Sequence, residues 1–168
     1  MNAEIKEKDE SEVKVEEKVA MEEISLWQQI KEDFSVPRLN DPALDSNFEL
    51  FFNYPGVWAI VSFRVTSKLY KGGWKRISRV LNGITQTISN IDIHPAATIG
   101  RRVFIDHGFG VVIGATAILK NDILIYQGVT LGGVSLDKGK RHPTIESNCV
   151  IGSGAKVLGN ITIGENSK

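Results

Sequence analysis

The chain has 168 residues, enough for one ordinary domain or two small ones with a hydrophobic core. Its 20 Lys and Arg residues balance 20 Asp and Glu residues, so no basic excess points to a nucleic acid or an anionic membrane as partner. The longest apolar run, residues 57–61, is far shorter than the roughly 20 residues that a bilayer span needs.

Residues 1–23 form an acidic segment. They hold nine acidic side chains against four lysines, with scattered aliphatic residues and no aromatic one. Such a segment cannot bury enough apolar surface to offset the entropy of ordering it, which predicts a disordered tail or a fraying helix. It lacks the apolar core of a secretory signal, and Cys149 has no second cysteine to pair with, so we expect a cytoplasmic protein.

Residues 24–90 are predicted to form an all-helical domain. Apolar residues recur at helical spacing from Ile24, and the first helix is expected to end before Pro37. Asp41 followed by Pro42 is typical of a helix start and predicts a second helix through residue 51. The motif at 54–56 and the glycine pair at 72–73 then delimit two more helices, through residues 57–69 and 74–88.

The pattern changes after residue 91, where aliphatic residues recur every six positions. All eleven positions are Ile, Leu or Val: Ile93, Ile99, Ile105, Ile113, Leu119, Ile125, Leu131, Ile145, Ile151, Val157 and Ile163. A second, mostly small or aliphatic set follows each by four residues; it includes Phe109 and Cys149, and we assign Cys149 to the core. This period predicts a parallel β-helix of hexapeptide repeats over residues 91–168, with a meander of short strands as the alternative.

Two insertions interrupt the repeat. The first lies within residues 106–110 and lengthens the step to eight; the second, residues 132–143, lengthens it to fourteen. Insertions in a regular solenoid typically form functional loops. His107 lies in the first and His142 in the second.

A neutral imidazole at His107 can take a proton from a hydroxyl if a carboxylate fixes its other nitrogen. In a coil of three hexapeptides, Asp92 lies nearly one turn below His107, whereas the adjacent Asp106 points to the opposite side of its strand. Asp92 is therefore the better candidate to orient the base. A solvated loop histidine and a turn-capping aspartate are the alternatives, and His94 is expected to be structural.

The second insertion offers groups for an anionic substrate. Arg141 can form a forked contact with a carboxylate, and His142 adds a second polar contact. The Gly132-Gly133 pair offers backbone amides that can approach an acyl carbonyl. A surface charge is the alternative role for Arg141.

Six motifs occur in order along the chain: Asp41-Pro42-Ala43, Tyr54-Pro55-Gly56, Asp92-Ile93-His94-Pro95-Ala96, Ile105-Asp106-His107-Gly108, Tyr126-Gln127-Gly128-Val129-Thr130-Leu131-Gly132-Gly133 and Gly139-Lys140-Arg141-His142-Pro143. This series resembles the serine O-acetyltransferases, hexapeptide-repeat acyltransferases that make O-acetylserine for cysteine synthesis. The resemblance covers about residues 25–168.

The resemblance implies an α+β fold, with an N-terminal all-helical domain followed by a left-handed parallel β-helix. It also implies a homotrimer, or a dimer of trimers, with active sites between neighbouring β-helices, and direct transfer of acetyl from acetyl-CoA to L-serine without a metal. The implied roles are His107 as general base with Asp92 as dyad partner, Asp41 and Asp106 at the serine amino group, Arg141 and His142 at its carboxylate, and Gly132, Gly133, Ser153, Gly154 and Ala155 along the acetyl-CoA groove.

The sequence departs from the family pattern in three places. Ala115 stands where the family usually has Glu, and residues 134–136 differ from the usual Thr-Gly-Lys loop. The chain stops at Lys168 in mid-coil, which we interpret as a truncation. Relatives continue to a tail that docks into O-acetylserine sulfhydrylase, so this partner is expected only for a longer chain.

Two other classes of function stay open from the residues. A γ-class carbonic anhydrase uses the same β-helix with three zinc-binding histidines, and this chain has three, without the close pair of that class. A non-catalytic interaction scaffold is the other.

Exposed β-helix side chains such as Tyr126 and Phe104 are expected to drive trimer formation.

Overall fold

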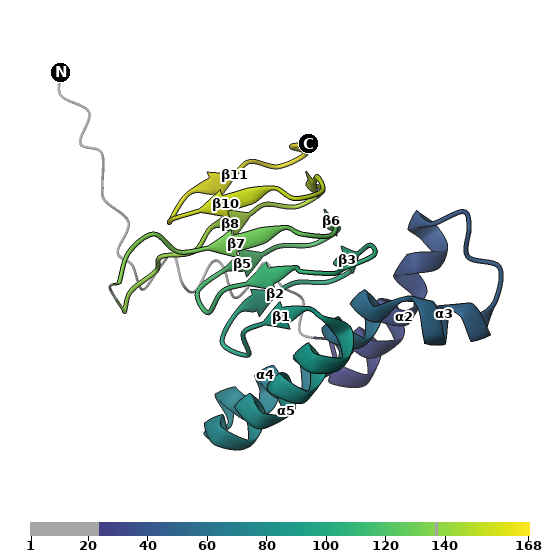
Figure 1. The fold of residues 1–168 in the computed structure, drawn as a ribbon, viewed down its shortest axis with the longest axis horizontal. Helices are drawn as coiled ribbons and strands as arrows, with labels where there is room; N and C mark the ends of the chain where they lie inside the picture. Colours follow the sequence, from purple (N-terminus) through teal and green to yellow (C-terminus); the bar gives the residue numbers. More distant parts are fainter. Residues whose placement is uncertain (1–23, 137) are drawn as a thin grey trace.

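The computed structural model describes residues 24–136 and 138–168. In this part of the chain, four helices gather at one end of a stack of short strands, and the C-terminus lies at the other end (Figure 1). The predicted disorder of residues 1–23 concerns a segment outside the described residues. No helix in the described part of the chain is long and apolar enough to cross a membrane.

Helix α2 spans Leu26–Asn40 and begins at the N-cap Ser25, whose hydroxyl accepts a hydrogen bond from the Gln28 amide. The prediction that it ends before Pro37 is wrong, because Pro37 lies inside its last turn. Proline removes one backbone donor there, but the turn is held by other bonds: the Asn40 side chain donates to the Val36 carbonyl and the Asp41 amide to the Pro37 carbonyl. Val36 and Pro37 are both buried.

Helix α3 spans Asn47–Asn53, so the prediction that Asp41 caps a helix starting at Pro42 is also wrong. Ser46 caps α3 instead, with its hydroxyl accepting from the Glu49 amide while the Glu49 carboxylate accepts from the Asp45 amide. This reciprocal arrangement satisfies two free donors at the helix start. Asp41 forms a tight turn, in which its carboxylate accepts from the Ala43 amide.

Helices α4 (Pro55–Lys71) and α5 (Lys75–Ser89) pack against each other and are separated at the predicted glycine pair. Gly56 lets α4 approach the β-helix closely, because a Cβ there would lie 2.0 Å from the Ile105 carbonyl oxygen. The amphipathic pattern predicted for α5 is present, but its apolar side chains are largely exposed: Ile77, Val80, Leu81, Ile84 and Ile88. A single chain therefore leaves this helix face uncovered.

The remaining residues form the predicted left-handed parallel β-helix. One sheet contains β1 (Asp92–Ile93), β4 (Val112–Ile113), β7 (Thr130–Gly132) and β10 (Lys156–Leu158). A second contains β2 (Thr98–Ile99), β5 (Ile118–Leu119), β8 (Thr144–Ile145) and β11 (Thr162–Ile163). A third contains β3 (Phe104–Ile105), β6 (Leu124–Ile125) and β9 (Val150–Ile151), and all pairings are parallel.

The predicted hexapeptide positions each fall on the second residue of one of these strands. Nine of the eleven are buried, and the other two, Val157 and Ile163, pack against the same core. Three members of the second inward set are exposed: Phe109, Ser135 and Ile161. Phe109 is 61% exposed, and Val111 fills the core in its place. The extra length of the first insertion shifts the inward position accordingly.

The expectation that Phe104 is exposed is also wrong. Phe104 is buried in a second core, where its ring stacks on Tyr54 with a centroid distance of 6.5 Å. Tyr126 is half-buried. Exposed apolar side chains lie on the helices, on α5 and around Phe48, Phe51 and Phe52, and also on the β-helix, as at Phe109 and Leu136.

A buried ion pair fastens the helices to the first coil. The Arg64 guanidinium of α4 donates to both carboxylate oxygens of Asp33 in α2, at 3.0 and 3.1 Å. Nη1 and Nη2 also donate to the carbonyl oxygens of Ile99 and Gly100, each at 2.7 Å. One side chain thus joins two helices and a β-helix corner.

We predict that Asp33→Ala lowers the free energy of unfolding by about 3–5 kcal/mol, because it leaves the Arg64 charge buried and partly unpaired. The control is Asp122→Asn, which removes the carboxylate charge of the exposed ion pair with Arg102, keeps a residue type that tolerates the left-handed backbone there, and should cost about 0–1 kcal/mol. Urea unfolding of both variants measures the difference. Equal losses of unfolding free energy in the two variants would show that the buried ion pair does not hold the helices on the first coil.

Candidate functional site

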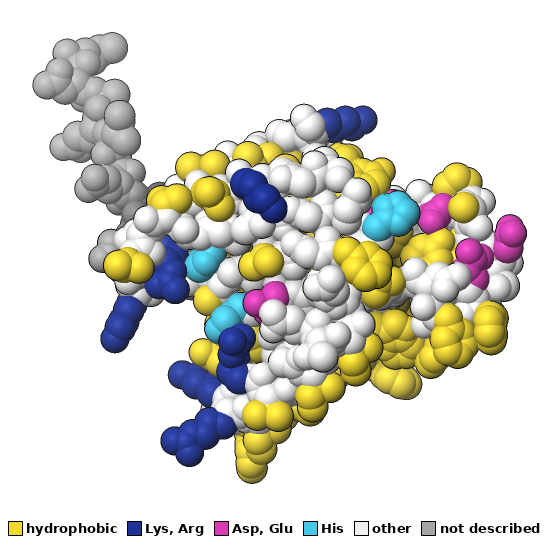
Figure 2. Space-filling model, viewed as in Figure 1, with side chains coloured by type: hydrophobic (Ala, Val, Ile, Leu, Met, Phe, Trp, Pro, Cys, Tyr) yellow, Lys and Arg dark blue, Asp and Glu magenta, His cyan; other side chains and the backbone are white. Residues whose placement is uncertain are grey.

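The two insertions lie at opposite edges of the sheet β1-β4-β7-β10. Residues 106–110 connect β3 to β4 and so precede a strand of this sheet, whereas residues 132–143 connect β7 to β8 and follow one. We call the corners before these strands the entry edge and the corners after them the exit edge. Histidine side chains appear at two separate places on the face in Figure 2, one of them beside Lys and Arg side chains.

At the entry edge, His107 projects into solvent with its side chain 69% exposed. Its backbone is left-handed, with φ of 57°, and Nε2 lies 3.7 Å from the Asp106 Oδ2. The expectation that Asp106 points away from His107 is therefore not met, because this backbone turns the imidazole back toward its neighbour. An exposed imidazole beside a carboxylate is accessible to a substrate hydroxyl.

Asp41 and Tyr54 belong to the same edge. The Tyr54 hydroxyl donates to Asp41 Oδ2 at 2.6 Å. This bond, the Ala43 amide and the charge of a protonated His107 hold the pKa of Asp41 below its ordinary value. Burial, and then the hydrogen bond to Asp41, raise the pKa of Tyr54, and Asp106 contributes to the rise. These contributions place Asp41, Tyr54, Asp106 and His107 in one electrostatic group.

At the exit edge, His142 is 7% exposed and lies over the corner of the preceding coil. Burial, followed by the charges of Arg141 and Lys140, lowers its pKa, so the ring is neutral near pH 7. Its Nδ1 lies 3.2 Å from the Thr116 amide nitrogen. Arg141 is adjacent and packs its side chain against Gly133. These residues form a second group.

Asp92 lies in the strand between the two edges and does not reach His107 in the same chain. The first insertion lengthens the first coil, so the register pairs Asp92 with Val112 of β4, and His107 lies earlier, in the corner before that strand. Asp92 Oδ1 accepts a 3.4 Å hydrogen bond from Asn82 of α5. Across residues 24–136 and 138–168, no hydrogen bond or ion pair joins Asp92 to His107.

The charge of Asp92 acts on His94 at the exit edge. Burial is the main cause that lowers the pKa of His94, and Asp92 opposes it. His94 Nδ1 accepts from the Ala96 amide at 3.0 Å, and its ring packs edge-on against Tyr70. Because His94 turns its ring nitrogen to its own backbone, its contacts are structural.

The five residues predicted for the acetyl-CoA groove divide between the edges in the same way. Gly132 and Gly133 lie at the exit edge, where Gly132 pairs with Leu158 of β10. Ser153, Gly154 and Ala155 form the entry corner before β10, and the Ser153 hydroxyl accepts from Gln127 at 2.7 Å. Within one chain these two groups lie at opposite ends of neighbouring strands.

Two residues of the site were not predicted individually. Tyr54 was noted only as part of a motif, because nothing in the sequence signals that a tyrosine and an aspartate in different helical segments are in contact. Thr116 precedes His142 by one full coil, and only the length of the second insertion would have shown that the two stack.

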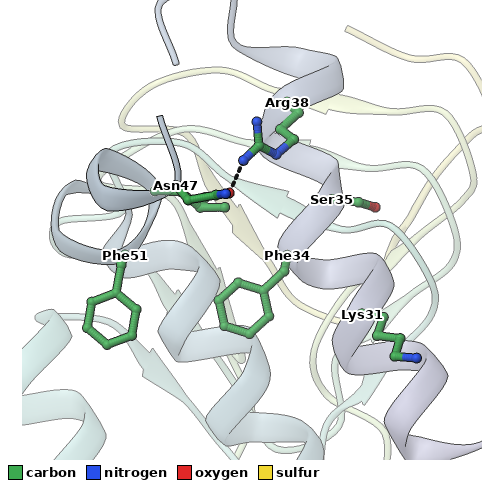
Figure 3. A pocket seen from close by; sticks show the side chains of 7 residues that line it. Lys31, Phe34, Ser35, Arg38, Asn47 and Phe51 are labelled. Atoms are coloured by element: carbon green, nitrogen blue, oxygen red, sulfur yellow. Dashed lines mark hydrogen bonds between the residues drawn. The ribbon is translucent and has the colours of Figure 1, made fainter. Parts of the chain in front are cut away.

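A hollow of about 410 Å³ lies between α2 and α3 and contains none of the predicted site residues. Phe34, Leu50 and Phe51 form its apolar wall, and Arg38 donates a hydrogen bond to Asn47 at its rim (Figure 3). Among the described residues, no group of three or more His, Cys, Asp or Glu side chains is arranged to hold a metal ion.

Comparisons with known proteins decide the family. No family model matches the chain. The chain is 48% identical to the serine acetyltransferase of Bacillus subtilis over 143 residues, covering 85% of this chain and 66% of that protein. It is 48% identical to the serine acetyltransferase of Helicobacter pylori over 128 residues, covering 76% of this chain and 75% of that protein. The chain belongs to the serine acetyltransferase family.

Solved serine acetyltransferases have the same fold. The Neisseria gonorrhoeae protein in complex with serine superposes with a TM-score of 0.80 at 38% identity, covering 84% of this chain and 58% of that one. A serine acetyltransferase in complex with CoA gives 0.77 at 36% identity, covering 84% of this chain and 58% of that one. The chain thus spans just under two thirds of the Bacillus subtilis relative, and about three fifths of these two solved chains.

We predict that Tyr54→Phe raises the pKa of Asp41 toward the ordinary aspartate value, because it removes the hydrogen bond that lowers it most. An aspartate with a lowered pKa stabilises the fold at neutral pH, and this contribution is lost as the pH falls through that pKa. The stability difference between wild type and variant should therefore stay constant from pH 7 to about pH 5 and narrow as the pH falls below about 4. Urea unfolding across this range measures it.

Tyr126→Phe is the control for that experiment, because the Tyr126 hydroxyl makes no hydrogen bond with any of the described residues. Its stability difference should not depend on pH. A constant difference for Tyr54→Phe as well would show that the bond to Asp41 does not set the carboxylate's titration.

Proposed function

We propose that this chain carries the serine O-acetyltransferase activity of its family, transferring acetyl from acetyl-CoA to the hydroxyl of L-serine to give O-acetylserine and CoA. Membership of the family carries the proposal. It is supported by related structures that hold serine or CoA, and by the presence here of the residues that the resemblance assigns to both substrates. The buried free thiol of Cys149 fits a reducing compartment such as the cytoplasm.

In this proposal His107 is the general base. Its imidazole takes the proton of the serine hydroxyl as that oxygen attacks the thioester carbonyl. The tetrahedral intermediate collapses by breaking the C–S bond, and the imidazolium returns its proton to the CoA thiolate. The exposure of His107 supports this role, because a substrate hydroxyl can reach the ring, and so does the Asp106 carboxylate 3.7 Å from its Nε2.

Each active site combines the entry edge of one copy with the exit edge of the next. The entry edge supplies His107, with Asp41 and Asp106 for the serine amino group. The exit edge of a neighbouring copy supplies Arg141 and His142 for the serine carboxylate, and Asp92 of that copy orients the base. The separation of these groups within one chain supports this assembly, as does the exposed apolar face of α5.

A closed ring of three copies satisfies this requirement, because every entry edge then meets an exit edge. Where an entry edge contacts an exit edge, the two halves of the acetyl-CoA groove come together. One copy supplies Ser153, Gly154 and Ala155, and the other supplies Gly132 and Gly133. A dimer of such trimers is compatible with the exposed aromatic residues on α3.

We predict that His107→Ala lowers turnover by about 10²- to 10⁴-fold while the assembly stays intact, because a positioned base contributes that factor and the exposed ring supports no core contact. Asp92→Asn should cost less, since it removes orientation and leaves the proton acceptor. Release of the CoA thiol with serine and acetyl-CoA measures both. An inactive wild type, or a His107→Ala variant with nearly full turnover, would contradict the proposed chemistry.

Mixed assemblies test the shared site. His107→Ala and Arg141→Gln chains, each inactive alone and co-expressed in equal amounts with two different tags, should recover about a quarter of wild-type activity, because each mixed trimer contains one site with both edges intact. Sites formed within one chain would recover none.

The matched control is a mixture of Arg141→Gln with Asp92→Asn. Both substitutions affect the same side of the site, so no mixed trimer restores a complete one, and the activity should stay at the level of the separate variants. Recovery in this mixture would place Asp92 on the His107 side and overturn the proposed division.

A further inference from the structure

Thr116 makes four polar contacts with the segment that carries Arg141 and His142. Its hydroxyl oxygen lies 3.0 Å from the Arg141 amide nitrogen and 3.2 Å from the His142 amide nitrogen. The same oxygen lies 2.8 Å from His142 Nδ1, and the Thr116 amide nitrogen lies 3.2 Å from that ring atom. One threonine therefore holds both the backbone and the ring at the end of the second insertion.

The register of the β-helix explains this contact. Ile118 of β5 pairs with Thr144 of β8. Thr116 and His142 precede these two partners by the same step along the chain, so the same register places Thr116 under His142. The ring lies so close to the corner below that a Cβ on Gly114 would be 2.0 Å from the His142 Cδ2. The insertion thus returns to the stack at one fixed point.

These contacts determine where the imidazole carries its proton. A backbone amide can only donate, so His142 Nδ1 must be an acceptor. The Thr116 hydroxyl already accepts from two amides, which leaves its own hydrogen to donate to Nδ1. A neutral ring with Nδ1 as acceptor carries its proton on Nε2.

We propose that Thr116 is a positioning residue that fixes His142 as the Nε2–H tautomer, so that its ring donates a hydrogen bond to the carboxylate of the substrate rather than acting as a second base. This rests on the proposed function. The charged and titratable groups around the ring agree with it: Arg141 and Lys140 both disfavour a second positive charge, and Lys140 donates to the His142 carbonyl. The charge of His142 also acts on His94, whose pKa is lowered mainly by burial.

The kinetic test compares Thr116→Val with Thr116→Ser. Valine keeps the shape and the backbone amide but loses the hydroxyl, so the KM for serine should rise about fivefold to tenfold while the KM for acetyl-CoA and kcat change less than about twofold. Serine at this position restores the hydroxyl and should restore the KM. Thr98→Val is the control: Thr98 lies in β2 of the first coil, away from His142, and the same change there should leave both KM values unchanged.

A second readout does not depend on activity. In protein labelled with ¹⁵N-histidine, the imidazole nitrogen spectrum of His142, identified by its loss in His142→Gln, should show a single Nε2–H tautomer. Thr116→Val should shift the Nδ1 resonance, because Nδ1 loses the hydroxyl donor and keeps only the backbone amide, and Thr116→Ser should return the wild-type pattern.

The outcomes separate the two proposals. An inactive wild type with the expected spectrum would overturn the proposed function and leave the hydrogen-bonding role of Thr116 supported. A wild-type spectrum with the proton on Nδ1 would overturn the inference. This result needs only the wild-type protein, so it can be obtained even if Thr116→Val does not fold. Equal loss for both substrates in Thr116→Val, without rescue by serine, would reduce Thr116 to a structural residue.

Discussion

The inward-pointing second residue of each strand is the constraint on which the rest of the structure depends. Parallel stacking requires that this residue lie above its counterpart in the coil below, as Ile113 lies above Ile93 and Leu131 above Ile113. A coil can therefore gain residues only at its corners. Each insertion lengthens the coil that contains it, yet the ladder above and below remains in register.

This constraint separates the chemistry of the chain into two halves. Residues that extend a corner must project outward, because the interior is filled by the ladder. The insertion with His107 lies before a strand of the first sheet, and the one with His142 lies after a strand of the same sheet. The width of that sheet keeps them apart, so the proposed site, which uses both, takes one insertion from each of two copies. Association is then part of the proposed catalytic mechanism as well as a means of covering apolar area.

The sequence predicted the β-helix well because inward burial is a local property that repeats with each hexapeptide. It failed where a distant segment decides the outcome. Phe104 looks exposed in the repeat, but Tyr54 from the helical layer covers it. Pro37 stops a helix in isolation, whereas burial and two nearby hydrogen bonds carry the helix through it here. Asp41 has the residue type of a helix cap, yet Ser46 has the better partner in Glu49.

For the site, the sequence indicated the residue types but not their grouping. A regular coil of three hexapeptides places Asp92 under His107, and only the observed register of the lengthened coil shows that it faces Val112 instead. The same register argument, applied to the coil with the second insertion, brings Thr116 to His142. An insertion therefore does two things at once. It supplies new side chains, and by changing the offset between coils it selects which residue of the coil below will orient them.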